Sequence, residues 1–131
     1  MSNIFLLGSL IGRLNLAIIH KKFFIIHKKS KKLELFLNIL VKENIIKNYI
    51  VNNNYFIIFL KFKNSISFIT NIKLLSKPGK KYYANLYKLN SLINKNKNTT
   101  IYFLYTTKGI LTGQNAKIQK IGGELLFQIK F

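Results

Sequence analysis

The sequence predicts an α/β (α+β) protein in which helices and strands alternate in the first half and antiparallel strands dominate the second. The first observation is a helical stripe of apolar residues between residues 33 and 45. The second is a pair of β-branched and aromatic runs on either side of three asparagines at residues 52–54. The third is the alternation of apolar positions from residue 124 to the end. With 131 residues, of which 49% are hydrophobic, the chain can bury a core as one domain or as two small lobes.

The first half is predicted to run helix, strand, helix, strand, strand. The first helix is indicated by apolar residues at helical spacing, namely Leu7, Leu10, Ile11, Leu14 and Ile18. Residues 23–26 are a short apolar run between lysine pairs and are predicted to form a strand. The second helix contains the stripe at residues 33–45, and the Ser30 hydroxyl is placed to accept from an unpaired backbone N–H as an N-cap. Residues 49–51 and 55–62 then pair as a hairpin.

The second half is predicted to begin near residue 64, which divides the chain into lobes at residues 1–64 and 65–131. Its first strand covers residues 66–75 and ends at the run Ser76-Lys77-Pro78-Gly79. Proline presets one central turn position and glycine tolerates a positive φ at the next, so this run predicts a type II turn.

Short strands with one helical element are predicted for the remainder. The expected strands are residues 81–84, 101–105 and 109–112. Residues 86–93 are irregular or a short helix, residues 94–98 are a polar loop, and residues 113–120 are a turn or short helix. In the final strand one face is expected to carry Leu125, Phe127, Ile129 and Phe131. The opposite face is expected to carry Glu124, Leu126, Gln128 and Lys130.

The charge balance indicates a polyanionic partner. The chain has 22 basic and three acidic residues, a formal net charge of +19. A protein with this imbalance repels itself unless it neutralises a polyanion, either nucleic acid or an anionic membrane surface. A membrane-surface protein would place its lysines along one face of a long amphipathic helix, whereas here they are spread over strands and turns. We therefore favour nucleic acid.

The sequence contains few residues of the types that catalyse reactions or bind metal ions. The three acids, Glu34, Glu43 and Glu124, are far apart in the sequence, and there is no cysteine. His20 and His27 are seven residues apart and flanked by lysines that would repel a cation, so we expect them to be solvated or to face phosphate. We expect no metal, no cofactor and no enzymatic activity, which argues against a nuclease.

A run near the C-terminus is the strongest functional motif. It reads Tyr105-Thr106-Thr107-Lys108-Gly109-Ile110-Leu111-Thr112 and is followed by Gly122-Gly123-Glu124. Short polar groups at the end of an apolar strand are suited to contact a rigid partner. The shallow minor groove of RNA offers 2′-hydroxyls and base edges to such groups.

The order of these motifs resembles the eighth protein of the bacterial-type small ribosomal subunit. The resemblance rests on the Ser-Lys-Pro-Gly turn, the Thr-Thr-Lys-Gly-Ile-Leu-Thr run and the Gly-Gly-Glu strand. Upstream, Arg13-Leu14-Asn15-Leu16-Ala17 is similar to the basic motif of the family's first helix, and Ser30-Lys31-Lys32-Leu33 to its second-helix cap. The resemblance covers almost the whole chain and is strongest over residues 75–124.

The resemblance implies an N-terminal α-β-α-β-β lobe packed against a mainly antiparallel β C-terminal lobe with a short helix. It implies a structural constituent of the small subunit that binds the central domain of the small-subunit ribosomal RNA and helps it fold during assembly. The expected partners are that RNA and neighbouring small-subunit proteins, with no membrane and no homo-oligomer. A non-ribosomal RNA-binding regulator stays an alternative.

The resemblance also implies the RNA-binding residues. In the C-terminal motifs these are Thr106, Thr107, Lys108, Gly109, Thr112, Lys117, Gly122, Gly123 and Glu124. Around the earlier turn and in the first half they are Ser76, Lys77, Lys80, Tyr82, Arg13 and Lys31. The lysines are expected to contact phosphates, and Tyr82 or Tyr83 either stacks on an unpaired base or belongs to the core.

Two motif residues keep alternative roles. Glu124 is expected either to form a salt bridge with a nearby lysine or to order the hydroxyl loop. Gly122 and Gly123 serve either the turn or the RNA contact.

The chain departs from the family at three positions of this region. The family usually has a serine where Tyr105 stands, an acid where Gly113 stands and an arginine where Lys117 stands. Lysine cannot make the bidentate contact of arginine, so we expect weaker direct readout of the RNA.

Codon usage suggests where the gene resides. Lysine outnumbers arginine 21 to 1, and Asn, Ile, Phe and Tyr are abundant. These residues have AT-rich codons, so we expect an organelle-encoded mitochondrial protein. A relic plastid and an AT-rich bacterial cytoplasm are the alternatives.

Overall fold

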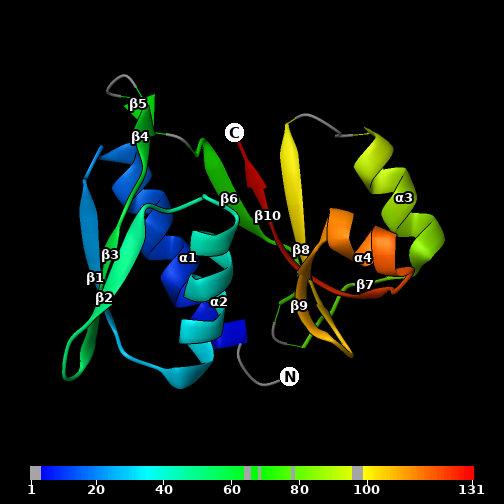
Figure 1. Ribbon diagram of the computed structural model, residues 1–131, viewed down its shortest axis with the longest axis horizontal. Coiled ribbons are helices and arrows are strands. Elements are labelled where there is room, and N and C mark those ends of the chain that lie inside the picture. Colours follow the sequence, from blue (N-terminus) through cyan, green and yellow to red (C-terminus); the bar gives the residue numbers. More distant parts are fainter. Residues whose placement is uncertain (1–3, 64–65, 68, 78, 96–98) are drawn as a thin grey trace. The chain divides into compact units, whose positions relative to one another are not determined.

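The computed structural model describes residues 4–63, 66–67, 69–77, 79–95 and 99–131. The chain divides into two compact units, Met1–Asn71 and Ile72–Phe131 (Figure 1). The boundary predicted near residue 64 falls outside the described residues and stays a prediction. The predicted mixture of helices and antiparallel sheet is confirmed.

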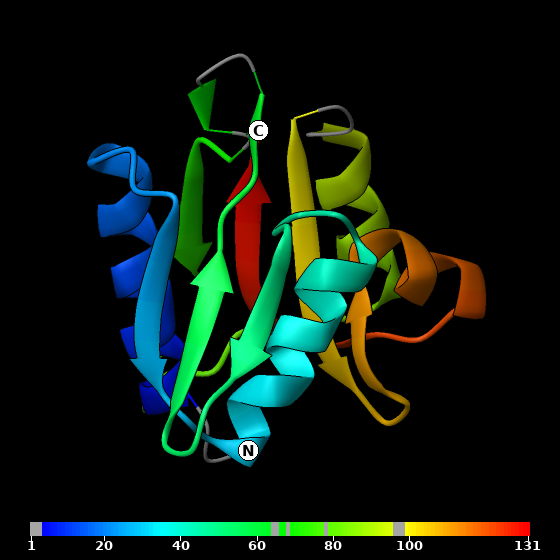
Figure 2. The same ribbon diagram turned by 60° about the vertical axis from the view of Figure 1, so that its left-hand side comes forward.

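The first unit contains the predicted succession of helix, strand, helix, strand, strand. In order these are α1 (Ile4–Ile19), β1 (Phe24–Lys28), α2 (Lys31–Lys42), β2 (Asn48–Val51) and β3 (Tyr55–Phe59). The strands form an antiparallel sheet in the order β1-β3-β2. Both helices lie on the same side of this sheet (Figures 1 and 2).

The helical stripes of the sequence supply the core between the helices and the sheet. The buried apolar residues of the two helices are Leu7, Leu10, Ile11, Leu14, Ala17, Leu33, Phe36, Leu37 and Leu40. On the sheet, alternate residues are buried because neighbouring side chains point to opposite faces. The outer face is left apolar: Phe24, Ile26, Ile50 and Tyr55 are each about half exposed.

Three local predictions in this unit need correction. Ser30 is the N-cap of α2 by position, but its side chain makes no capping bond. Its carbonyl oxygen accepts from the backbone N–H of Glu34 at 3.1 Å instead. The helix ends at Lys42, before the predicted residue 45, and Asn44 then takes a left-handed conformation that asparagine tolerates. His27 is buried rather than solvated, with its Nδ1 3.0 Å from the Lys28 carbonyl oxygen, whereas His20 is exposed.

The predicted strands at residues 55–62 and 66–75 are each interrupted. β3 ends at Phe59, and β4 (Phe62–Lys63) pairs with β5 (Ile66–Ser67) as a separate two-stranded sheet. β6 (Asn71–Leu74) instead joins the sheet of the second unit beside β10 (Gly123–Lys130). A β-branched run predicts extended backbone but not its partner, so one run can contribute to two sheets.

The second unit is built on a sheet of five strands. Beyond β6 and β10 it contains β7 (Tyr83–Ala84), β8 (Thr100–Thr106) and β9 (Gly109–Thr112). The order is β6-β10-β8-β9, and β7 pairs with the start of β10. Helices α3 (Leu86–Lys95) and α4 (Gly113–Gln119) contribute to one core cluster with this sheet, in which Leu89, Ala116, Leu104 and Leu125 are fully buried.

Three further predictions have a definite outcome in this unit. The irregular segment at residues 86–93 is a helix, started where the Asn85 side chain accepts from the backbone N–H of Lys88 at 2.9 Å. The loop predicted at residues 94–98 belongs to α3 as far as Lys95, and residues 96–98 lie outside the described residues. The predicted turn is closed by reciprocal backbone bonds between Lys77 and Lys80, with Gly79 at φ 80°; Pro78 lies outside the described residues.

The simple alternation predicted for the last strand is wrong. The pairing of β10 with β8 shifts between Leu125 and Phe127, so that Leu126 is an extra residue. Leu125 pairs with Leu104 and Phe127 with Phe103, which are neighbours on β8 and therefore face opposite ways. Phe127 stacks on Phe103 at 4.7 Å between ring centroids, while Leu125 faces the helices.

Candidate nucleic-acid interface

The hydroxyl run forms the tip of the β8–β9 hairpin. Thr106 pairs with Gly109, so Thr107 and Lys108 are the two turn residues, and both are exposed. Gly109 has φ 95°, a conformation that costs glycine little and other residues much more. The tip therefore presents one hydroxyl and one ammonium group from a narrow turn.

The hydroxyl of Thr106 is engaged inside the hairpin. It donates to the Gly109 carbonyl oxygen at 2.8 Å and accepts from the backbone N–H of Lys108 at 3.1 Å. The side chain is only 5% exposed. The two adjacent threonines therefore differ in role: Thr106 holds the turn closed, and Thr107 is open to a partner.

The glycine pair lets the start of β10 pass close to its neighbours. A Cβ on Gly122 would lie 2.6 Å from the Ala84 carbonyl oxygen, and a Cβ on Gly123 would collide with the carbonyl oxygen of Tyr105. Neither glycine has a positive φ. Close backbone approach therefore requires a residue without a Cβ at both positions.

Glu124 lies on β10 between Tyr105 of β8 and Tyr83 of β7. It is 4% exposed, and its Oε2 has no hydrogen-bond partner among the residues that the structure describes. Within the same part of the chain, no lysine forms the predicted salt bridge with it. A buried carboxylate oxygen without a donor is costly, and its burial keeps it out of reach of solvent in this structure.

The earlier turn is attached to the same corner of the sheet. Ser76 is fully buried, and its hydroxyl donates to the Leu125 carbonyl oxygen at 2.6 Å while accepting from the backbone N–H of Tyr82 at 2.9 Å. Lys77 and Lys80 are exposed at the turn. Ser76 therefore positions the two lysines and has no free donor itself.

Tyrosines surround a shallow hollow beside the glycine pair. It is lined by Tyr83, Ala84, Asn85, Leu86, Tyr87, Gly122 and Gly123. Tyr83 and Tyr87 are 64% and 85% exposed. Tyr82 is less exposed, and the ammonium of Lys88 lies 4.0 Å from its ring centroid. The sequence reasoning missed Asn85 and Tyr87; three tyrosines within six residues, at positions 82, 83 and 87, were the available signal.

The remaining candidate residues are engaged locally or are exposed on a helix. Thr112 is buried and caps α4 by accepting from the backbone N–H of Asn115 at 3.3 Å. Lys117 is exposed on α4. In the first unit, Lys31 is exposed at the start of α2, and Arg13 Nη1 donates to the Ile26 carbonyl oxygen at 2.8 Å.

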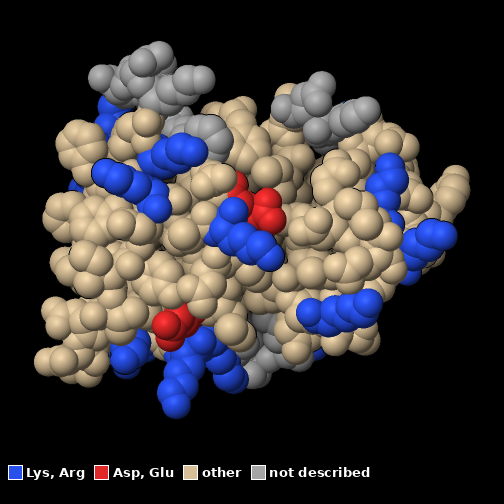
Figure 3. Space-filling view, viewed as in Figure 1, with Lys and Arg blue, Asp and Glu red and all other residues tan. Residues whose placement is uncertain are grey.

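Basic side chains are numerous on the face drawn in Figure 3. Figure 3 shows lysine and arginine spread over the face in view, with only small acidic areas between them. In the part of the chain that the structure describes, no three His, Cys, Asp or Glu side chains are placed to hold a metal ion. Among these same residues, no helix is both long and apolar enough to cross a membrane.

Comparison with known sequences gives one consistent family. The sequence model for ribosomal protein S8 matches residues 7–129. Small ribosomal subunit protein uS8 of Malacoplasma penetrans is 32% identical over 111 residues, which cover 81% of this chain and 82% of the relative. Protein uS8m of Acanthamoeba castellanii is 35% identical over 106 residues, covering 80% and 83%. Protein uS8c of Euglena gracilis is 39% identical over 92 residues, covering 69% and 59%.

Proposed function

The chain belongs to the ribosomal protein S8 family, and from this we propose that it is a structural constituent of the small ribosomal subunit. It binds the central domain of small-subunit ribosomal RNA, supports the folding and assembly of that domain, and is not an enzyme. Its neighbours are other proteins of the subunit, and it does not form homo-oligomers. The formal charge of +19 supports this role, because backbone neutralisation contributes much of the affinity for RNA.

The proposal rests on the hairpin tip, where one threonine closes the turn and the next two residues are exposed. The Thr106 hydroxyl closes the turn, which leaves Thr107 and Lys108 exposed at its end. A threonine hydroxyl both donates and accepts, so Thr107 can pair with a 2′-hydroxyl or a base edge in the minor groove. Lys108 then reaches the adjacent phosphate.

Glu124 supplies the complementary acceptor. Its Oε2 lacks a donor among the described residues, and the RNA minor groove carries 2′-hydroxyl and amino donors. Because Glu124 pairs with Tyr105 in the sheet, it lies one residue along from the strand end that carries the hydroxyls. We infer that this corner of the sheet opens when the complex forms, so that the carboxylate of Glu124, buried in the free chain, receives an RNA donor.

Lysines and tyrosines around this corner extend the contact. Lys77 and Lys80 project from a turn that Ser76 anchors to β10, so they can fix the register of the protein on the RNA backbone. Tyr83 and Tyr87 offer exposed rings on which an unpaired base can stack. Lys117 and, from the first unit, Lys31 add phosphate contacts, whereas the Arg13 guanidinium donates to the Ile26 carbonyl oxygen beside β1.

We propose that the protein works in mitochondria. Both uS8m and uS8c are among its relatives, and the excess of residues with AT-rich codons supports an organellar gene. Co-sedimentation with small ribosomal subunits from a mitochondrial extract checks this directly.

Replacement of Thr107 tests the role of the tip. We expect Thr107→Ala to weaken binding to the cognate ribosomal RNA hairpin about tenfold, because a hydrogen bond to RNA is lost. Binding to a random RNA duplex should change little. Thr70→Ala, which removes an exposed threonine far from the tip in sequence, is the matched control. Equal losses for the hairpin and the random duplex, measured by filter binding at one salt concentration, would contradict the proposal.

A further inference from the structure

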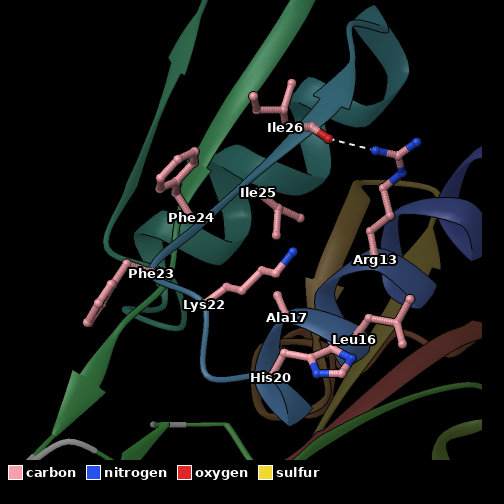
Figure 4. A pocket seen from close by; sticks show the side chains of 9 residues that line it. All are labelled: Arg13, Leu16, Ala17, His20, Lys22, Phe23, Phe24, Ile25 and Ile26. Carbon is pink, nitrogen blue, oxygen red and sulfur yellow. Dashed lines mark hydrogen bonds between the residues drawn. The ribbon is translucent and has the colours of Figure 1, made fainter.

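A groove in the first unit runs along the outer edge of β1. Figure 4 shows α1 on one side of it and the strand on the other. Its lining from the helix is Arg13, Leu16, Ala17 and His20, and its lining from the strand side is residues 22–26. β1 is an edge strand, since its only strand partner within the described part of the chain is β3.

The edge of β1 carries backbone groups that are available to another strand. The Phe23 carbonyl oxygen accepts from the Leu60 N–H, and the Lys29 N–H donates to the Asn54 carbonyl oxygen. In an antiparallel ladder, bonding to the neighbouring strand then falls on the odd-numbered residues. The N–H groups of Phe24 and Ile26 therefore point away from the sheet, and we find no acceptor for them among the described residues.

The Ile26 carbonyl oxygen is already engaged at this edge, as is that of Lys28, which lies 3.0 Å from His27 Nδ1. The guanidinium of Arg13 donates to the Ile26 carbonyl oxygen at 2.8 Å across the groove (Figure 4). This bond fixes the guanidinium beside the strand edge. Its other N–H groups remain to bind an anion that enters the groove.

The groove combines apolar surface with positive charge. Leu16, Phe23 and Phe24 are 57%, 73% and 50% exposed, and the buried Ala17 and Ile25 lie beneath them. Such a concentration of exposed apolar side chains marks an interaction surface. Arg13, His20 and Lys22 add basic groups, and none of the lining residues is acidic.

We propose that this groove binds an extended, acid-rich segment of a neighbouring protein of the small subunit, which adds to β1 as a fourth strand. The inference rests on the proposed ribosomal function. The free N–H groups alternate with the spacing of a β-strand, which a peptide backbone matches residue by residue. Carboxylates of the segment pair with Arg13 and Lys22, and its apolar side chains cover Leu16 and Phe24.

A peptide accounts for more of these features than RNA does. Phosphates could reach the N–H groups and the basic side chains. They would leave the apolar surface of Leu16, Phe23 and Phe24 uncovered and would not follow the alternation of the strand edge. Binding of RNA at this groove is therefore an outcome that would overturn the proposal.

Hydrogen exchange and photo-crosslinking on purified small subunits test it. We expect the amides of Phe24 and Ile26 to exchange at least about tenfold more slowly in the subunit than in the free protein. A photo-reactive amino acid at position 23 should crosslink to an acid-rich, extended protein segment. Unchanged exchange at both amides, or crosslinks to ribosomal RNA or to a helix, would overturn the inference.

Two proline variants distinguish loss of binding at the edge of β1 from a general effect on folding. Ile26→Pro removes an outward N–H and leaves the bonds to β3 in place, so the protein should still fold. We expect its crosslinking to fall about tenfold. Val51→Pro removes an outward N–H from β2, the opposite edge of the same sheet, and should leave crosslinking unchanged.

The same preparations distinguish the two proposals. If the wild-type chain is absent from small subunits, the proposed function fails. If the chain is present but the edge amides stay unprotected, only the present inference fails. The hydrogen-exchange measurement uses the wild-type chain, so it tests the inference even if Ile26→Pro does not fold.

Discussion

At the scale of single residues, several polar side chains expected to contact RNA are used to build the site. The hydroxyls of Thr106, Ser76 and Thr112 each bond to the protein's own backbone. All three residues are buried. We therefore expect these three residues to act on RNA binding by holding their exposed neighbours in place, whereas the side chain of Thr107 is exposed.

This difference predicts that replacement of Thr106 lowers stability, whereas replacement of the adjacent Thr107 leaves it almost unchanged. Thr106→Val should lower the free energy of unfolding by about 1–2 kcal/mol, because it removes the bonds to Gly109 and Lys108. Thr107→Val, at an exposed turn position, should change it by less than about 0.5 kcal/mol. Urea denaturation of both variants provides the measurement, and equal destabilisation would show that the Thr106 hydroxyl does not hold the turn.

At the scale of elements, the site depends on how closely strand β10 approaches β7 and β8. Gly122 and Gly123 permit that approach, and the extra residue Leu126 then changes the direction of the following side chains. The bulge lets Leu125 join the core under the helices while Phe127 stacks with Phe103 on the other face. The start of β10 is thereby placed so that Glu124 lies between two tyrosine-bearing strands.

The close approach at Gly123 leads to a prediction about stability. Gly123→Ala should destabilise the protein by roughly 1–3 kcal/mol, because the new methyl group meets the Tyr105 carbonyl, which cannot move without disturbing the sheet. Gly12→Ala is the matched control: nothing lies within 4 Å of its Cβ position, and it sits in α1. It should stabilise by up to about 1 kcal/mol. Thermal and urea unfolding compare the two, and a stabilising Gly123→Ala would refute the close approach.

At the scale of the whole molecule, the charge sets the strength and the salt dependence of RNA binding. The chain has 22 basic and three acidic residues, and lysines are spread over the face drawn in Figure 3, so we expect many of them to share the neutralisation of phosphates and few of them to carry specificity. We therefore propose that affinity and fit come from different parts of the chain. Lysines on the surface would supply the affinity, and one corner of the five-stranded sheet would supply the fit.

Salt titration tests this division. Lys77→Ala should reduce the slope of log affinity against log salt by about one, because one phosphate contact is lost. Lys42→Ala, at the end of α2, is an exposed lysine outside the candidate set and should leave the slope unchanged. Thr107→Ala should lower the affinity at every salt concentration without changing the slope. Equal slopes for the two lysine variants would show that net charge alone, and not the turn, decides the contact.

Part of the site was predictable because its signals are local. The hairpin of β8 and β9 follows from two apolar runs around a short turn with a glycine, and the second hairpin from three asparagines. The order of helices and strands followed from periodicity, which depends only on neighbouring residues. The separate β4–β5 pair and the bulge did not follow, because pairing partners are not encoded in a periodicity.

The sequence by itself determined the class of fold, the order of the elements, the polyanionic partner and the hairpin that carries the hydroxyls. Only the tertiary structure decided which hydroxyls are free, why two glycines precede Glu124, and which strand edge is open. Those properties depend on contacts between residues far apart in the chain, as when Ser76 bonds to Leu125 across 49 positions. Local patterns specify what a segment can form, and the folded contacts decide which of its polar groups remain for a partner.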